Sequence, residues 1–335
     1  MNKRYLGKSR LEVTAIGFGC MSLTGSYGEV SESDAIAVIH KAIDLGITFF
    51  DTADVYGKGV NEQVLGTAVK GKRNGVVIAT KFGNVINSEG RTIGVDASPA
   101  RVKSSCEESL IRLGIDHIDL FYLHRIDPKT PVEETIAAMA ELVKEGKVRY
   151  LGLSEASAKT IRLANAVHPI TALQTDYSIC EREVEASILP TCRELGIGFV
   201  AYKPLASGLL TGQLKKFEDV ENKGGYEFSI IPRLSTRDVF EKNLAAVKVI
   251  EEIAKKKGCK SSQVALAWVL AQGSDIVALP GTKHINYLEE NVASLDIKLT
   301  KADKSALDKI AACIVGDRFS EAAMGRVRGR QEWDS

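Results

Sequence analysis

Eight short apolar runs, separated by longer amphipathic stretches, constrain the fold of this chain more than any other feature of its sequence. Each run has the length and the β-branched and aromatic content of a buried strand. The strands are predicted at residues 15–19, 48–50, 76–80, 118–123, 148–153, 172–175, 198–201 and 276–278. Between them, apolar residues recur with the 3.6-residue period of helices that pack on one face. These helices are predicted at residues 31–45, 99–113, 132–144, 158–166, 185–195 and 239–257.

This alternation predicts an α/β protein and, because there are eight strands, a (β/α)8 TIM barrel. A doubly wound open sheet is the alternative, since it also alternates strands with helices. That fold would need a glycine-rich fingerprint after its first strand. The candidate stretch, Gly17-Phe18-Gly19-Cys20, lacks the third glycine and is not followed by a helical pattern. The sequence therefore predicts a single barrel domain over residues 1–335.

Several segments fall outside the repeating strand and helix units. Residues 4–6 and 11–13 predict a β-hairpin that plugs the amino-terminal mouth of the barrel. The long connection 206–238 follows the seventh strand, and loops of that length on a catalytic face are typically lids or ligand clasps. Residues 301–313 predict one extra C-terminal helix, and residues from about 320 to 335 predict a flexible tail.

Composition excludes several classes of function. The formal net charge is +1, with no basic block and no acidic tail, so neither a nucleic-acid partner nor an anionic membrane surface is predicted. No apolar run is long enough to span a bilayer, and no signal-peptide core follows the first residues. The six cysteines are scattered singly, which predicts no metal site and a reducing, cytoplasmic location. The oligomeric state is not predicted.

Chemically versatile side chains follow three consecutive predicted strands. Asp51 ends the second strand and Tyr56 lies five residues later, while Lys81 ends the third strand and His124 ends the fourth. In a barrel the carboxyl-terminal strand ends open into one cavity, so these four side chains are expected together. Taken singly, each has an ordinary structural explanation, such as a turn aspartate or a buried histidine. Their joint occurrence favours a catalytic site.

The four residue types have complementary chemical roles. A lysine favours the tyrosinate and should lower the pKa of Tyr56, and an aspartate compensates the charge of that lysine. A histidine can orient or polarise a carbonyl oxygen. The set is suited to donate a proton to an oxygen that gains negative charge, as happens when hydride is transferred to a carbonyl. A Schiff-base barrel, with Lys81 as the nucleophile, is a further hypothesis.

Longer stretches of the sequence resemble the aldo-keto reductase family over nearly the whole chain, most closely its bacterial, fungal and plant members with His-Arg after the fourth strand. The matching stretches are GITFFDTADVYG at residues 46–57, TK at 80–81, DLFYLHR at 119–125, AYKPL at 201–205, LPGTK at 279–283 and EN at 290–291. The resemblance implies an NADP(H)-dependent reduction of aldehydes or ketones, with NAD(H) not excluded and a small carbonyl compound as substrate. It implies that Tyr56 is the general acid, Lys81 its pKa modulator, Asp51 the partner of Lys81, and His124 the substrate-orienting group.

The resemblance also implies a cofactor track across the barrel mouth. Tyr202 would stack on the nicotinamide, and Ser154 and Gln174 would bond its carboxamide. The other implied cofactor contacts are Met21, Asp51, Lys203, Leu205, Ser207, Gly281, Thr282, Lys283, Glu290 and Asn291. A loop that leads into a helix N-terminus at Thr282 and Lys283 is also a ready anion site on physical grounds.

Three positions depart from the common family pattern. Glu155 stands where asparagine is frequent, Tyr287 where an arginine often faces the 2′-phosphate, and Lys203 where serine often follows the stacking tyrosine. The substrate pocket is expected from loops near Tyr27, Val55, Phe82, Arg125 and residues 224–234. A cofactor-binding regulatory subunit that senses redox state, with little turnover, is the alternative function.

Overall fold

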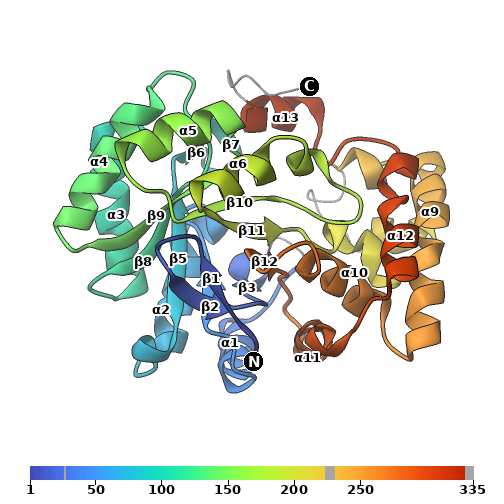
Figure 1. The fold of residues 1–335 in the computed structure, drawn as a ribbon. Coiled ribbons are helices and arrows are strands. Elements are labelled where there is room, and N and C mark those ends of the chain that lie inside the picture. The colour runs from blue at the N-terminus through green and yellow to red at the C-terminus, as the bar shows by residue number, and fades with distance from the viewer. Residues whose placement is uncertain (26–27, 223–230, 329–335) are drawn as a thin grey trace.

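The central sheet is a barrel of eight parallel strands in the order β12-β11-β10-β9-β8-β5-β4-β3 (Figure 1). The structure is a computed structural model and describes residues 1–25, 28–222 and 231–328. A parallel bridge between Ile16 and Ala278 joins the two outer strands, so the sheet closes on itself. The strands are β3 (Phe18–Gly19), β4 (Phe49–Asp51), β5 (Val77–Phe82), β8 (Ile118–Leu123), β9 (Val148–Ser154), β10 (Ala172–Asp176), β11 (Gly198–Tyr202) and β12 (Ile276–Leu279). The predicted TIM-barrel fold is confirmed.

Helices surround the barrel and pack on their neighbours, from α1 through α6 and from α10 through α11 back to α1. They are α1 (Glu32–Asp44), α2 (Val60–Val69), α3 (Pro99–Leu113), α4 (Val132–Lys144), α5 (Ala158–Val167), α6 (Ile188–Leu195), α10 (Ser261–Leu270) and α11 (Ile285–Ala293). Serine side chains at Ser31, Ser98 and Ser157 accept backbone N–H groups at three helix starts. Glycines in the left-handed conformation, Gly114 and Gly196, end α3 and α6.

Side chains alternate between two apolar cores along each strand. On β4, Phe49 lies in the barrel interior, whereas Phe50 packs outward against the helices. On β8, Tyr122 lies inside and Phe121 outside. This follows from the two-residue period of a strand, which sends successive side chains to opposite faces. On each strand, therefore, only every second side chain can reach the barrel interior.

The N-terminal hairpin fills the amino-terminal end of the barrel, as predicted. Strands β1 (Lys3–Leu6) and β2 (Leu11–Thr14) pair in antiparallel orientation, and Leu6, Leu11 and Val13 join the interior core. The Arg4 guanidinium donates to the backbone carbonyls of Leu270, Gly273 and Ile276, which ties the hairpin to the start of β12. With this end filled, only the carboxyl ends of the strands remain open to a ligand.

Two elements between predicted strands were not anticipated from the sequence. Helix α2 lies between β4 and β5, and the hairpin β6 (Asn84–Ile86) and β7 (Thr92–Val95) extends from the end of β5. The hairpin is short, polar and glycine-containing, so it carries no strong apolar alternation. The connection predicted over residues 206–238 holds a 3-10 turn (Ala206–Thr211), helix α7 (Phe217–Asn222) and the start of helix α9 (Arg237–Lys257), while residues 223–230 lie outside the described part.

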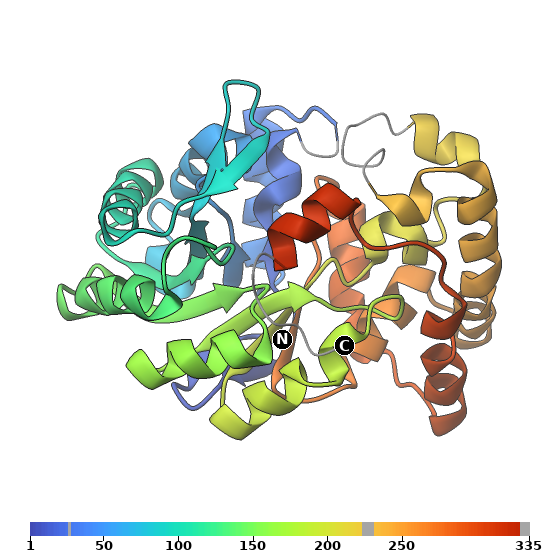
Figure 2. The same cartoon turned by 90° about the horizontal axis from the view of Figure 1, so that it is seen from above.

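The C-terminal region contains more helix than the sequence predicted. Helix α12 (Lys301–Asp308) and a 3-10 turn (Ala311–Cys313) occupy the segment predicted as one helix, and α9 packs against both α10 and α12. The predicted tail over 320–335 begins with helix α13 (Glu321–Arg328), and its residues 329–335 lie outside the described part. In Figure 2, α13 lies over the middle of the molecule, between the β6–β7 hairpin and α9.

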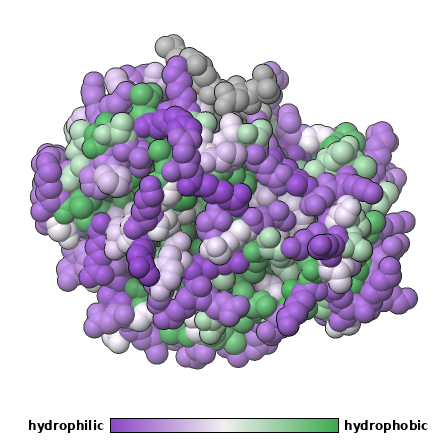
Figure 3. All heavy atoms as spheres, viewed as in Figure 1, coloured by the Kyte–Doolittle hydropathy of each residue, from purple (hydrophilic) through white to green (hydrophobic). Residues whose placement is uncertain are grey.

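The outer surface is mainly hydrophilic, with apolar side chains scattered among charged ones on the face seen in Figure 3. None of the helices in the described ranges is both long and apolar enough to cross a membrane. All six cysteines are free thiols, and Cys20, Cys106, Cys180 and Cys192 are buried. These four buried cysteines behave as small apolar residues, as the sequence indicated for most of the six.

The close contact between the N-terminal hairpin and β11 can be tested by adding a side-chain atom at Gly198. A Cβ atom at Gly198 would lie 2.6 Å from the Leu6 Cα and 2.9 Å from the Gly7 nitrogen, and backbone atoms cannot yield as a flexible side chain can. We expect Gly198→Ala to lower the free energy of unfolding by about 1–3 kcal/mol through overpacking. Gly75→Ala is the matched control, because a Cβ there meets open space. Urea denaturation measures both, and equal stability of the two variants would contradict the contact.

Candidate active site

A cavity of about 910 Å³ opens at the carboxyl ends of the barrel strands. Asp51, Lys81 and His124 each follow an interior residue by two positions, namely Phe49, Ala79 and Tyr122. The same parity that turns those residues into the barrel therefore turns the three polar side chains toward its upper interior. Gln174 and Tyr202 follow the interior residues Ala172 and Val200 in the same way.

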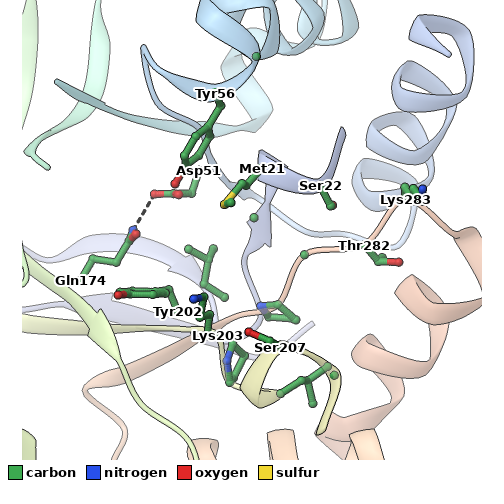
Figure 4. Close-up of a pocket in the computed structure, with 18 of the residues that line it drawn as sticks. Met21, Ser22, Asp51, Tyr56, Gln174, Tyr202, Lys203, Ser207, Thr282 and Lys283 are labelled. Atoms are coloured by element: carbon green, nitrogen blue, oxygen red, sulfur yellow. Dashed lines mark hydrogen bonds between the residues drawn. The ribbon is translucent and has the colours of Figure 1, made fainter. Parts of the chain in front are cut away.

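Tyr56 reaches this interior from the loop after β4. It begins a 3-10 turn (Tyr56–Gly59), and Gly57 within that turn has φ +55° with no room for a Cβ beside Thr24. Asn61, at the start of the helix that follows this turn, ties it to the segment after β3, because its Nδ2 donates to the Cys20 carbonyl and to the Thr24 hydroxyl at 2.9 Å. In Figure 4 the Tyr56 ring points toward Asp51. Local packing therefore positions the phenol.

Lys81 and Asp51 form a buried ion pair at the base of the site. The Lys81 side chain is fully buried, and its Nζ also donates to the Thr52 carbonyl at 2.8 Å and to the Tyr56 hydroxyl at 3.4 Å. Gln174 Nε2 donates to the second Asp51 oxygen at 2.7 Å, the bond drawn in Figure 4. Both charges thus have partners, which a buried pair requires if it is not to destabilise the fold.

The ammonium form of Lys81 is favoured in this environment. Burial opposes the charge, but Asp51 and Tyr56 outweigh burial and raise the pKa of Lys81. A Schiff-base nucleophile must be an accessible neutral amine. Lys81 is neither accessible nor neutral, so this geometry argues against the Schiff-base hypothesis.

The phenol of Tyr56 is protonated at neutral pH. Burial raises the pKa of Tyr56, and the nearby Lys81 ammonium opposes that rise without cancelling it. The influence of Lys81 has the direction expected from the sequence, but the expected net lowering of the pKa does not occur because desolvation of the phenolate is larger. The side chain is consequently held in the form that can donate a proton.

His124 is neutral and held in one orientation. Burial, together with the Arg125 and Lys81 charges, lowers the pKa of His124 well below its ordinary value. Asn84, from strand β6, lies with its Nδ2 3.2 Å from His124 Nδ1. With Nδ1 accepting from the Asn84 amide, the ring proton resides on Nε2. The imidazole and the Tyr56 ring meet edge to face, with centroids 6.0 Å apart. Sequence analysis missed Asn84, because it lies on the unpredicted hairpin.

All of the predicted cofactor contacts line the one cavity. Gln174 and Tyr202 lie at one end, and Thr282 and Lys283 face them from the far side in Figure 4. The remaining lining residues from that prediction are Met21, Asp51, Ser154, Lys203, Leu205, Ser207, Gly281, Glu290 and Asn291. The cavity therefore brings together a succession of polar groups of the kind that an extended dinucleotide requires.

Two further observations fit a dinucleotide in this cavity. Ser22 lines it, and its hydroxyl is buried without a hydrogen-bond partner among the described residues, which leaves it for a ligand. Gly281 approaches so closely that a Cβ there would lie 2.6 Å from the Gly19 carbonyl oxygen. The two backbone segments can therefore approach each other this closely only with glycine at this position.

The three positions that depart from the family pattern behave differently from one another. Lys203 and Tyr287 line the cavity, and the Tyr287 ring packs edge to face with His284 at 5.3 Å. Glu155 does not line the cavity but is fully buried and paired with Arg318. A carboxylate that is committed to an arginine is not a carboxamide ligand, so of the residues expected near the nicotinamide carboxamide only Ser154 and Gln174 line the cavity.

The pocket wall agrees only partly with the sequence expectation. Val55 and Arg125 line the cavity, whereas Phe82 is fully buried in the outer core. Tyr27 and residues 224–230 lie outside the described residues. The unexpected wall residues come from the β6–β7 hairpin and from the segment before α13, namely Asn84, Ile86, Glu89, Gly90, Thr92 and Phe319. An aromatic residue in a polar C-terminal segment was the available sequence signal for Phe319.

Comparisons with known proteins agree with this geometry. The profile of the Aldo/keto reductase family matches residues 15–312. An aldo-keto reductase from Bacillus halodurans, solved in its holo form, is 32% identical, with a TM-score of 0.76 over 94% of this chain and 98% of that chain. A glycerol dehydrogenase from Gluconobacter oxydans is 30% identical, with a TM-score of 0.81 over 94% and 96%. A thermostable aldo-keto reductase solved with the inhibitor epalrestat is 29% identical, with a TM-score of 0.73 over 92% and 100%.

Asp54, between Asp51 and Tyr56, is buried beside the site without a strong partner. Neither carboxyl oxygen accepts a hydrogen bond from the described residues, and Arg101 is 3.7 Å away. Burial, with the nearby Glu62 charge, raises the pKa of Asp54 to about 7. The folded protein therefore keeps a proton that the unfolded chain releases near pH 4.

This proton makes stability depend on pH in a predictable direction. Because the folded-state pKa is raised, the free energy of unfolding should fall as pH rises from about 4 to about 7 and then level off. Asp54→Asn should remove this pH dependence. The stability of the variant relative to wild type should therefore rise between pH 4 and pH 8, by on the order of 1–4 kcal/mol, and the variant should be the more stable form at pH 8. Asp44→Asn, at an exposed position on α1, is the control. Parallel pH profiles for wild type and Asp54→Asn in urea denaturation would contradict the assignment.

Proposed function

The chain belongs to the aldo-keto reductase family, and we propose that it reduces an aldehyde or ketone to the alcohol. When bound, a reduced nicotinamide cofactor, NADPH by preference, supplies the hydride. The observation that carries the proposal is the convergence of Asp51, Tyr56 and His124 at one end of the cavity, with the buried Lys81 bonded to both Asp51 and Tyr56. Each comes from a different strand end or loop, and the protonated Tyr56 phenol, the Lys81 ammonium and the neutral His124 imidazole are the forms that carbonyl reduction needs.

Tyr56 is the proposed proton donor to the carbonyl oxygen. As that oxygen gains negative charge, the Tyr56 hydroxyl transfers its proton to it, and the phenolate left behind faces the Lys81 ammonium, 3.4 Å from the hydroxyl. Lys81 stays in its ammonium form because its ion pair with Asp51 stabilises the positive charge. The site therefore accepts negative charge on Tyr56 without having to reorganise, which is the main source of electrostatic catalysis.

His124 is proposed to orient the carbonyl group. With Nδ1 occupied by the Asn84 amide, the Nε2–H group is left to donate to the substrate oxygen. A neutral imidazole donates a hydrogen bond without competing with Tyr56 as an acid. Orientation and proton donation are thereby assigned to different side chains.

Support for NADPH over NADH comes from the adenosine end of the cavity. Lys283 and His284 line it beside Thr282, at the start of helix α11. A cationic side chain and a helix N-terminus both favour a phosphate at this position. Tyr287, where relatives often carry arginine, leaves Lys283 as the principal charge. We also propose a cytoplasmic location, in keeping with six free thiols.

A variant of the proposed acid tests the reaction. Wild-type enzyme should oxidise NADPH in the presence of members of an aldehyde and ketone panel, and Tyr56→Phe should lower kcat at least about 100-fold, as expected for a general acid. Tyr5→Phe, an exposed tyrosine on the N-terminal hairpin, should leave kcat unchanged. A Tyr56→Phe variant with wild-type kcat would refute the assigned role.

The same panel separates the enzyme from the regulatory alternative. Tight NADPH binding by the wild type, without reduction of any carbonyl compound and with a stoichiometric protein partner, would favour a redox-sensing subunit. Turnover of several carbonyl compounds would favour the enzyme.

Cofactor preference has its own test. Lys283→Gln should raise the KM for NADPH by about tenfold and leave the KM for NADH nearly unchanged, because only NADPH carries the 2′-phosphate. Lys298→Gln, at an exposed position beyond α11, is the control. Equal effects on both cofactors, or a wild-type preference for NADH, would show that Lys283 does not read the phosphate.

A further inference from the structure

A buried charged cluster lies beside the nicotinamide end of the cavity and includes a residue from the far end of the chain. Arg318, just before α13, donates from its two terminal nitrogens to the two carboxylate oxygens of Glu155 at 2.6 and 2.7 Å. The side chains are 4% and 0% exposed. A two-point pair in a buried site holds its partners in a fixed geometry, unlike an exposed ion pair.

Tyr202 is the third member of this cluster. Its hydroxyl donates to a Glu155 oxygen at 2.6 Å and lies 3.5 Å from an Arg318 nitrogen, while Tyr202 itself lines the cavity. Asp176 Oδ2 lies 4.0 Å from the same guanidinium. Because Glu155, Asp176 and Tyr202 stand at the ends of β9, β10 and β11, Arg318 holds three neighbouring strand ends together.

The next residue in the chain brings the C-terminal segment into the cavity. Phe319 lines the cavity, and its ring centre lies 4.0 Å from Lys203 Nζ and 5.4 Å from the Arg318 guanidinium carbon. Contacts of this kind favour a cation over an aromatic face. The segment that carries α13 across the molecule in Figure 2 is therefore joined to the cavity through Arg318 and Phe319.

Glu155 is a costly residue at its position. Its φ of +54° is left-handed, a conformation that disfavours a glutamate by about 1–2 kcal/mol but suits asparagine. Burial by itself would raise the pKa of Glu155, but Arg318 reverses this and lowers it to about 2. The carboxylate is thus ionised in a strained, buried place, and its bonds to Arg318 and Tyr202 offset those costs.

We propose that Glu155 and Arg318 are positioning residues that tether the C-terminal segment over the active site. The tether fixes Tyr202 as the platform for the nicotinamide ring and holds Phe319 as a wall of the cavity above Lys203. The role assigned to Tyr202 rests on the proposed function, whereas the tether of the C-terminal segment does not. The nicotinamide platform in this chain is therefore completed by a residue more than 100 positions beyond it.

The test compares three variants. Arg318→Gln alone leaves a buried carboxylate without its partner and should lower the melting temperature. The double variant Glu155→Gln/Arg318→Gln removes both charges, so it should regain part of that stability while lacking the tether. Arg73→Gln is the control, because it breaks a partly buried pair with Asp119 at the start of strands β5 and β8, away from the cavity.

Three measurements distinguish an effect on the position of Tyr202 and the C-terminal segment from an effect on the stability of the fold. The double variant should show a kcat about tenfold lower and an NADPH Kd several-fold higher, followed by fluorescence, because a misplaced platform costs rate even when the fold is intact. Chymotrypsin should cleave it after Phe319 faster than it cleaves wild type. Arg73→Gln should lose melting temperature yet keep wild-type kcat and NADPH affinity.

The outcomes distinguish this proposal from the reaction itself. A double variant with wild-type kcat and NADPH affinity, or an Arg73→Gln variant with equal losses in both, would overturn the positioning role. If wild type neither binds NADPH nor reduces any carbonyl compound, the proposed function fails. In that case faster cleavage of the double variant after Phe319 still supports the tether, and equal cleavage overturns it.

Discussion

The two-residue alternation of side chains along strands that close into a barrel is the constraint on which the site depends. Once Phe49, Ala79 and Tyr122 are committed to the interior, Asp51, Lys81 and His124 must follow them there. The N-terminal hairpin fills the other end of the interior with apolar side chains, and these polar side chains lie at the carboxyl ends of their strands. Three strand ends and the turn after β4 thereby supply the candidate catalytic groups, and the same apolar core that stabilises the barrel also orients them. A shift of register by one residue would reverse the parity of a strand and remove its contribution to the site.

Charge compensation explains why such a polar interior is tolerated. Lys81 and Asp51 are almost completely buried, and either charge alone would cost several kcal/mol. Together, with Thr52 and Gln174 satisfying their remaining hydrogen-bonding groups, they form a neutral unit. This unit is placed so that it can stabilise one further negative charge, on Tyr56. Burial keeps Tyr56 protonated, as the proposed transfer of its proton to a substrate requires.

Much of this arrangement could be predicted from sequence, because it is encoded locally. The apolar runs give the strands, and a polar residue at the end of each run gives its place at the barrel mouth, so the pattern alone was enough to group Asp51, Lys81 and His124. What escaped prediction depends on contacts between distant segments. The β6–β7 hairpin carries no strong period of its own, and with it Asn84 was missed. The net pKa of Tyr56 was missed because burial cannot be weighed against a neighbouring charge without coordinates. Arg318 and Phe319 were missed because nothing near them in sequence indicates that their partners are Glu155 and Lys203.

Most non-glycine residues with positive φ in the described part of the chain lie at the carboxyl end of the barrel or in the loops that follow it. Among the described non-glycine residues with positive φ, Lys58, Lys203 and Ser207 line the cavity, Glu155 and Ala206 are each next in sequence to a lining residue, and Arg10 lies in the hairpin. Each such conformation costs on the order of 1 kcal/mol or more, and such strain persists only where the surroundings enforce it. Here the surroundings are the rigid strand ends, held by the Lys81–Asp51 pair on one side and by Arg318 on the other. Strain gathers where the backbone must turn sharply to bring side chains over the cavity. The regular barrel below supplies the stability that this end lacks.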